Sequence, residues 1–371
     1  MLIIDSHLDL SWNALQFERD LTQPVHVIRQ TEVSMAGKSR ALNTVALPEL
    51  RRGRVFVCFA TMLARASGHP SPGIEYRSVA QAHAVAQGQL AYYRALEAAG
   101  HCRVIETAPQ LEAHVAAWQA EDESANNANQ NTNRTQMEGP PLGFVISMEG
   151  ADPITSPSEL ERWYAAGLRL LGPAHYGANR YAGGTGCELG LTPDLGPALL
   201  REMRRLNMAL DCTHLCDQAF WEALALFDGP VVASHQNCRT LVPVQRQFTD
   251  EQLKAIIARD GVIGAAMDII MLRPGWQPAT MHNLNAPNPV MLREVVDQID
   301  HVCQLAGNAR HAAIGSDLDG GFGREQSPRD LDTIADLQLL VGLLAERGYK
   351  PDDIAAIMHG NWLRLLRRLL A

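Results

Sequence analysis

Residues 2–12, LIIDSHLDLSW, place polar groups at every second position within a run of β-branched and apolar residues. Side chains alternate across a β-strand, so Asp5, His7 and Asp9 are predicted to share one face of it. Burying unpaired charge on an otherwise apolar strand is costly. The stretch therefore predicts a strand whose polar face is either a solvated edge or a binding site.

Seven more apolar runs of strand length follow, and helix-length amphipathic segments separate the later ones. Near-continuous apolar strands that alternate with helices indicate a parallel sheet covered by helices. Eight such units fit a (β/α)₈ TIM barrel, an α/β fold that needs roughly 250 residues and tolerates insertions. We therefore expect residues 1–371 to form a single barrel domain. The predicted strands lie within residues 2–10, 54–63, 142–150, 166–176, 207–214, 229–236, 261–268 and 311–320.

The length in excess of a barrel lies mainly between the second and third predicted strands. Residues 78–118 are predicted to form a long helix and further helical or short-strand structure, ending near Ala117 and Trp118. The stretch 121–141 is polar and Asn-rich, so we expect a flexible surface insertion there. Residues 351–370 carry apolar side chains at helical spacing, which predicts a C-terminal helix packed on the barrel or on a partner subunit.

Composition excludes several classes of function. The formal net charge of −9 offers no basic face for nucleic acid. No apolar run approaches the roughly 18 residues of a membrane helix, so we expect no membrane partner. The first strand follows Met1 with no export signal before it, which predicts a cytoplasmic protein. Seven cysteines without a tight framework of spacings predict reduced thiols and no disulfide scaffold.

Polar residues stand where the predicted strands end. In a barrel of this kind the working residues lie at the C-terminal mouth, which is where these strand ends meet. Four strands that each end in histidine, together with strands that end in carboxylates, are hard to assign to chance. The residues, in strand order, are His7 and Asp9, Glu149, His175, His214, His235, and Asp317 with Asp319.

Imidazole and carboxylate groups without a cysteine pair suit zinc or a similar first-row cation. His7 and Asp9 are predicted to hold one ion, and His214 and His235 a second. Glu149 has two oxygens and could bridge them. Two metals roughly 3.5–4 Å apart would share an activated water, as in binuclear hydrolases.

Other charged residues near the predicted mouth could orient a metal ligand or bind the substrate. Asp5 lies one layer deeper on the first strand and could orient a ligand. Arg180, Arg239 and Arg246 follow the site strands, and one of them could hold an anionic substrate through two hydrogen bonds. From the residues alone, the prediction reaches a binuclear metal-dependent hydrolase.

Several motifs together resemble those of a known family, the membrane (renal) dipeptidases, which are the M19 peptidases of the amidohydrolase superfamily. The resemblance spans nearly the whole chain and includes the closing segment MHGNWLRL. It implies a barrel with two Zn²⁺ ions per chain, held by the ligand set given above. The matching motifs, in order, are DSHLDL, SMEG, the histidine of GPAHYG, DCTHL, SHQNCR and GSDLDGG.

The resemblance also implies roles for the remaining site residues. Asp317 matches the acid that takes the proton of the bridging water and delivers it to the leaving amine. His175 matches the residue that stabilises the oxyanion of the scissile carbonyl. Arg246, eleven residues after His235, matches the arginine that holds the substrate's terminal carboxylate.

The implied activity is hydrolysis of a dipeptide, with a D-residue accepted at its C-terminal position, and a homodimer is compatible with the family. One alternative is hydrolysis of another carboxylate-bearing amide, such as an N-acyl amino acid or a β-lactam. Another is a barrel without catalytic activity. The segment AAMDII after the seventh strand places Asp268 where many relatives carry a substrate-positioning tyrosine, which leaves substrate preference open.

Overall fold

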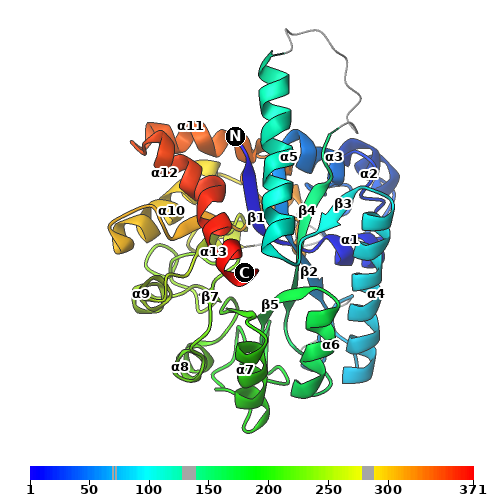
Figure 1. Ribbon diagram of the computed structural model, residues 1–371, viewed down its shortest axis with the longest axis vertical. Helices are drawn as coiled ribbons and strands as arrows, with labels where there is room; N and C mark the ends of the chain where they lie inside the picture. The colour runs from blue at the N-terminus through cyan, green and yellow to red at the C-terminus, as the bar shows by residue number, and fades with distance from the viewer. Residues whose placement is uncertain (69–70, 72, 128–138, 278–287) are drawn as a thin grey trace.

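The computed structural model describes residues 1–68, 71, 73–127, 139–277 and 288–371. At the centre of the protein, eight parallel strands form a ring. Each strand of the ring lies beside the next one along the chain, and the last strand, β9, pairs with the first, β1 (Figure 1). A parallel bridge between Ala233 and Ile263 joins β7 to β8. The (β/α)₈ barrel is thus confirmed, with every strand inside its predicted range. The strands are β1 (Ile3–Leu8), β2 (Val55–Leu63), β4 (Leu142–Glu149), β5 (Leu168–Gly172), β6 (Ala209–Asp211), β7 (Val231–Val232), β8 (Ile263–Ala265) and β9 (Ala312–Ile314).

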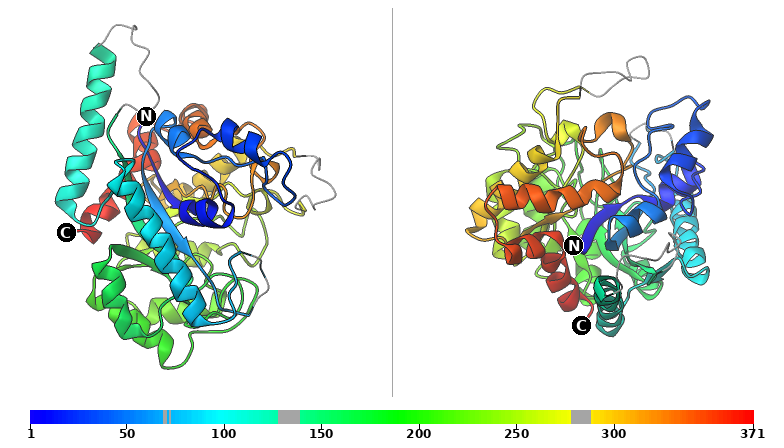
Figure 2. Two further views of the ribbon diagram at one scale, coloured as in Figure 1. Left: turned by 90° about the vertical axis from the view of Figure 1, so that its right-hand side faces the viewer. Right: turned by 90° about the horizontal axis from the view of Figure 1, so that it is seen from above.

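Helices form a layer around the strands, as the two further views also show (Figure 2). The layer forms because amphipathic helices bury one stripe against the sheet; α7, for example, buries Leu199, Leu200 and Met203. None of the helices in the described ranges is long and apolar enough to cross a membrane. Those of the outer layer are α4 (Val79–Ala98), α6 (Leu160–Ala165), α7 (Leu195–Arg205), α8 (Asp217–Leu226), α9 (Asp250–Ala258), α10 (Leu292–Ala306) and α11 (Leu339–Glu346).

Shorter helical segments connect the strands and the longer helices along the chain. Three α-helices, α1 (Leu10–Gln16), α2 (Val25–Glu32) and α3 (Leu47–Arg52), connect β1 to β2. Single 3₁₀ turns occupy Pro157–Glu159, Ile269–Met271, Arg324–Gln326 and Ile334–Gln338.

The insertion between β2 and β4 is more regular than predicted. It contains α4, a short strand β3 (Cys102–Val104) that pairs with the first residues of β4, and α5 (Ala108–Asn127). The predicted helix end near Ala117 and Trp118 is wrong, and residues 121–127 of the expected flexible stretch are helical. Low apolar content does not end a helix when residues of high helix propensity such as Ala120 and Glu121 continue it. Of the remainder of that prediction, residues 128–138 fall outside the described residues, and residues 139–141 are in neither helix nor strand.

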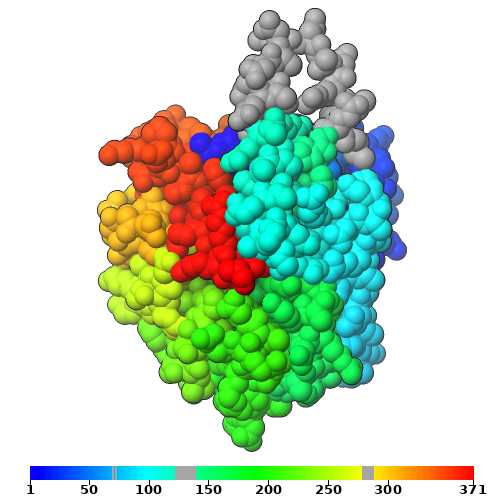
Figure 3. All heavy atoms as spheres, in the orientation of Figure 1, coloured from blue at the N-terminus to red at the C-terminus, as the bar shows by residue number. Residues whose placement is uncertain are grey.

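The C-terminal helix is present but interrupted. It consists of α12 (Pro351–Ala355), a π-helical turn (Ala356–Gly360) and α13 (Asn361–Leu369). Its apolar residues are buried against the barrel, where Asn361 donates to the carbonyls of Ala309 and Ala312, at 2.7 and 2.8 Å. On the surface, α13 lies beside α5 (Figure 3), and an Arg367–Glu112 ion pair of 2.6 Å joins them. The predicted apolar stripe therefore packs on the barrel itself.

A buried histidine on α5 should make stability depend on pH. His114 is fully buried, and its Nε2–H donates to the Phe56 carbonyl at 2.9 Å. Burial lowers the pKa of His114 to about 4, so the unfolded chain, with a histidine pKa near 6.5, binds more protons below neutrality. Stability should therefore fall as the pH drops through 6.5 toward 4. Between pH 7 and pH 5, the wild type should lose about 2 kcal/mol of unfolding free energy relative to His114→Gln, measured by urea denaturation. Equal losses in both proteins would contradict this role.

Candidate metal centre

The strand ends bring the predicted site residues together at one mouth of the barrel. His7 lies within β1, and Glu149 is the last residue of β4. Four others each lie three residues beyond the end of a strand, which places them at a similar height above the ring. These four are His175 after β5, His214 after β6, His235 after β7 and Asp317 after β9.

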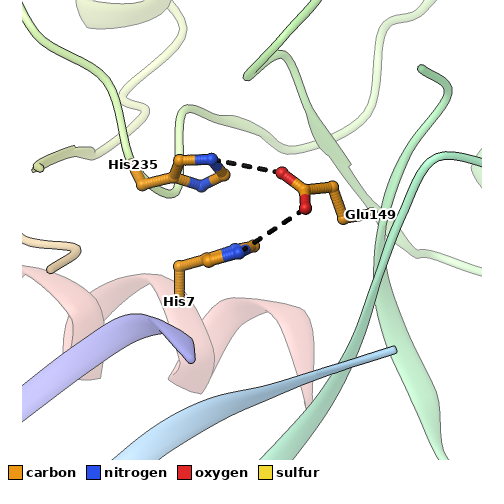
Figure 4. A group of neighbouring side chains, drawn as sticks. All are labelled: His7, Glu149 and His235. Atoms are coloured by element: carbon orange, nitrogen blue, oxygen red, sulfur yellow. Dashed lines mark ion pairs between the residues drawn. The ribbon is translucent and has the colours of Figure 1, made fainter. Parts of the chain in front are cut away.

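Glu149 stands at the centre of the imidazoles. Its Oε1 lies 3.1 Å from His214 Nε2 and 3.2 Å from His235 Nε2. Its Oε2 lies 3.7 Å from the Nε2 atoms of both His7 and His175. Figure 4 shows His235 and His7 approaching different oxygens of this carboxylate. One carboxylate thus faces two separate groups of side chains, one with each oxygen.

His7 also faces two further carboxylates. Its Nε2 lies 3.6 Å from Asp9 Oδ2 and 3.7 Å from Asp317 Oδ1. Asp9 is not on the strand as predicted, because β1 ends one residue earlier and Asp9 is the N-cap residue of α1. The chain turn nevertheless keeps the Asp9 carboxylate beside His7.

Two other acids near the strand ends serve the backbone instead. Asp5 Oδ1 accepts the backbone N–H of Ser316, at 2.8 Å, and of His7, at 3.3 Å, so it fixes the chain at two site strands. Asp319 Oδ1 accepts from the backbone N–H and the hydroxyl of Thr44, at 2.7 and 2.8 Å. Asp319 therefore holds the loop before α3 and is turned away from Glu149.

The residues present fit divalent metal ions. Buried polar atoms are normally hydrogen-bonded, yet His7 Nε2, Asp9 Oδ1 and Glu149 Oε1 have no hydrogen-bond partner among the described residues. Nitrogen and oxygen donors with unused lone pairs are the ligands that zinc takes. Ligand atoms within 4.8 Å of one another form three overlapping groups: His7 with Glu149 and His235, Glu149 with His175 and His214, and His7 with Asp9 and Asp317.

Electrostatics also favours a cation here. Burial raises the pKa of Glu149 to about 7 and that of Asp317 well above its usual range. Burial lowers the pKa of His214 and of His235 well below the ordinary value. For His7 burial works against the charged form, but the surrounding negative charges, led by Glu149, raise its pKa to about 10. A bound cation would invert this balance, because it favours ionised carboxylates and neutral imidazoles.

Hydroxyl groups lie behind three of the four imidazoles. A hydroxyl oxygen can accept the Nδ1–H of a histidine and leave the Nε2 lone pair free for a metal. No local signal in the sequence marked these residues, because each hydroxyl is ordinary by itself and two of the three come from another strand or loop. The contacts to Nδ1 are Thr185 Oγ1 with His214 at 2.9 Å, Ser234 Oγ with His235 at 2.9 Å, and Thr61 Oγ1 with His7 at 3.4 Å.

The backbone is strained at two site positions. His214 and Asp317 adopt left-handed conformations, with φ of 70° and 57°. Such conformations cost about 1–3 kcal/mol and persist where the surrounding structure imposes them. The turns immediately after β6 and β9 thereby direct both side chains back over the mouth.

Of the three candidate arginines, Arg246 lines the pocket beside Glu149. Arg239 is instead engaged by both oxygens of Asp217, at 2.7 and 2.8 Å. The side chain of Arg180 donates to the Thr155 carbonyl at 3.0 Å. The structure thus leaves Arg246 as the arginine that reaches the mouth.

The pocket above the cluster has an empty volume of about 460 Å³, which includes open solvent at its mouth. Arg246 is held in it by hydrogen bonds to Gln236 Oε1 and to the His235 carbonyl, at 2.8 and 3.0 Å. Asp268 also lines the pocket, and its Oδ1 accepts from Gln326 at 2.7 Å. The apolar part of the wall consists of Trp12, Leu63, Ile74 and Met271.

A parallel α/β barrel with imidazoles and carboxylates converging at its mouth defines the class of metal-dependent barrel enzymes. The chain belongs to the membrane dipeptidase family, peptidase family M19, whose family model matches residues 1–370. It is therefore an enzyme of the metallo-dipeptidase class, and the resemblance stated from the motifs is confirmed.

Relatives of known sequence include an uncharacterized protein from the pqqA 5′ region of Klebsiella pneumoniae. It is 31% identical over 236 residues, which cover 62% of this chain and 82% of that protein. The dipeptidase aclJ of Aspergillus oryzae is 28% identical over 229 residues, which cover 61% of this chain but only 51% of the fungal protein.

Solved structures share the fold over the full chain. The dipeptidase AC, a metallo peptidase of family M19, has a TM-score of 0.75 at 24% identity, with 100% of this chain and 99% of that one covered. A metallo peptidase of Rhodobacter sphaeroides, liganded with a phosphinate mimic of L-Ala-D-Ala, has a TM-score of 0.74 at 23% identity, with the same coverage. At these identities the likeness establishes the fold.

Proposed function

We propose that this protein is a dipeptidase with two Zn²⁺ ions in its active site. The observation that carries the proposal is the position of Glu149, whose two oxygens face separate groups of ligand atoms. His7 and Asp9 would hold one ion, and His214 and His235 the other. The bound metals would supply an activated water nucleophile and polarise the scissile carbonyl.

The chain's own residues handle the proton and the developing charge. Asp317 lines the pocket beside His7, where its carboxylate can take a proton from the attacking water and pass it to the leaving amine nitrogen. His175 lies on the other side of Glu149, where its Nε2–H can donate to the oxyanion.

Arg246 would hold the terminal carboxylate of the substrate. Its two anchoring hydrogen bonds use one N–H on each terminal nitrogen, so others remain for a carboxylate in the pocket. Support for a D-residue at the C-terminal position comes from the Rhodobacter sphaeroides structure and its L-Ala-D-Ala mimic. We include L,D-dipeptides in the proposed substrate class on that ground.

The test of the proposed function is a turnover screen of the zinc-loaded protein against matched L,L- and L,D-dipeptides, before and after chelation. We expect hydrolysis of at least one series, lost on chelation and restored by zinc. Two bound metals without dipeptide turnover would indicate that the substrate is another carboxylate-bearing amide. Less than one metal per chain after zinc-replete purification, with no turnover, would favour a barrel without catalytic activity.

Replacing Arg246 by alanine is expected to raise KM for dipeptides by about 10–100-fold, because a charged hydrogen bond contributes roughly 1.5–3 kcal/mol. Steady-state kinetics should show a much smaller change in kcat. Arg180→Ala is the matched control, since the Arg180 side chain binds the Thr155 carbonyl and does not line the pocket. An unchanged KM in Arg246→Ala would end the assignment of Arg246 as the carboxylate-binding group.

A further inference from the structure

Arg65 lies behind His175 and contacts it directly. Its Nη1 is 2.9 Å from His175 Nδ1, and the arginine side chain is buried, with 1% of its surface exposed. Arg65 follows β2, whereas His175 follows β5, so the contact connects two separate strand ends. Arg65 is held in turn by an ion pair to Glu75, at 3.4 Å, and by a backbone bond to Ile74. It is not among the residues that line the pocket.

The chemistry of this contact determines where the imidazole proton is. A guanidinium group has only donors and stays protonated in proteins. His175 Nδ1 must therefore accept, and the neutral ring carries its proton on Nε2. That Nε2 faces the mouth of the barrel, 3.7 Å from Glu149 Oε2.

The other three imidazoles have the opposite arrangement. Thr185, Ser234 and Thr61 place a hydroxyl beside Nδ1, and a hydroxyl oxygen can accept a hydrogen bond from the N–H of that nitrogen. A metal-ligating histidine almost always donates its outer N–H in this way, which frees the inner lone pair. By distance alone His175 belongs to a candidate metal group with Glu149 and His214. A protonated Nε2 has no lone pair to offer a metal.

We propose that Arg65 is a positioning residue that keeps His175 in its Nε2–H form. This arrangement excludes His175 from the metal ligands and directs its N–H toward the oxyanion of the substrate. The proposal rests on the proposed dipeptidase function and extends it with a residue that does not touch the substrate.

The tautomer can be observed without any turnover. Long-range ¹H–¹⁵N spectra of the imidazole side chains would be recorded on the zinc-loaded protein, with His175→Gln to assign the signals. We expect His175 as a neutral ring with its proton on Nε2, and three other site rings with the proton on Nδ1. A proton on Nδ1 of His175, or a zinc-bound Nε2, would overturn the proposal even if the enzyme hydrolyses dipeptides. Failure of the dipeptide screen alone would leave this result intact.

Kinetics supplies the second measurement. Arg65→Met is expected to lower kcat by about 10–100-fold with little change in KM, since loss of a whole oxyanion donor costs roughly 10²–10³. Arg65→Lys, which keeps a cationic donor, should recover part of the loss. In a His175→Gln background the same Arg65→Met change should have no further effect on kcat, because the two residues act as one unit.

If Arg65 had only a structural role, Arg65→Met would lower stability without acting on kcat through His175. Arg169 is a buried arginine that donates to the carbonyls of Glu106 and Tyr164, remote from the mouth, so Arg169→Met is the matched control. It should lose stability and keep kcat per folded molecule. Equal kcat losses from Arg65→Met in the wild-type and His175→Gln backgrounds would show that Arg65 does not act through His175.

Discussion

Replacing Asp317 by asparagine is expected to lower kcat by about 10²–10⁴-fold, the usual contribution of a general acid–base group. The amide keeps the shape of the side chain but cannot take up a proton from water. Since Asp317 lies at the mouth with Oδ1 3.7 Å from His7 Nε2, its carboxylate is well placed for that proton. Stopped assays of a saturating dipeptide, with metal content measured on the same samples, would give the loss in kcat at constant zinc.

Asp319→Asn is the matched control for this prediction. Asp319 lies two residues further on, is buried and, like Asp317, has a left-handed backbone, but it binds Thr44. We expect this change to reduce thermal stability and to leave kcat near the wild-type value. Undiminished kcat in Asp317→Asn would remove the proton-carrying role. A loss of zinc in that variant would instead move Asp317 into the ligand set.

Replacing Glu149 by glutamine should have the largest effect, abolishing measurable turnover through loss of metal. Both oxygens of Glu149 face imidazoles, and an amide offers one neutral oxygen in place of two that share a charge. Loss of an outer partner of a metal ligand already lowers affinity by about 10–100-fold, and loss of a ligand that bridges two ions, the role proposed for Glu149, should cost more. The metal content measured after dialysis is expected to be two ions per wild-type chain and fewer than one per Glu149→Gln chain.

Thermal unfolding gives the same prediction a readout besides activity. An ion that binds the folded state raises Tm with its concentration, so zinc should stabilise the chelated wild type and have little effect on Glu149→Gln. Glu49→Gln is a suitable control, because Glu49 is a buried glutamate that binds the Val25 backbone, on another part of the chain. Two tightly bound ions in Glu149→Gln would rule out Glu149 as the bridge.

The barrel itself was predictable from the sequence because its signals are local. Each barrel strand is part of a short apolar run, and all eight barrel strands lie within their predicted ranges. The interruption of the last helix and the end of α5 were not predicted. The last helix contains a π-helical turn, and α5 continues past Trp118 to Asn127, because helix propensity carried it into a polar segment.

The candidate metal residues were also visible in the sequence, since a barrel places strand ends at one mouth. The family motifs led to the same positions. The motif GSDLDGG alone did not show which of its two acids faces the candidate metal site. Both have positive φ, yet the turn after β9 directs Asp317 to His7 and Asp319 to Thr44.

The fold, the family and the candidate metal-binding side chains were therefore predictable from the sequence, because periodicity and motif order are properties of the chain. Which nitrogen of each imidazole faces the site could not be predicted in this way. That choice depends on groups from segments distant in the sequence, the Thr185 hydroxyl behind His214 and the Arg65 guanidinium behind His175. A hydroxyl oxygen can accept a hydrogen bond, whereas a guanidinium can only donate one. These contacts therefore distinguish a predicted metal ligand, His214, from a predicted hydrogen-bond donor, His175.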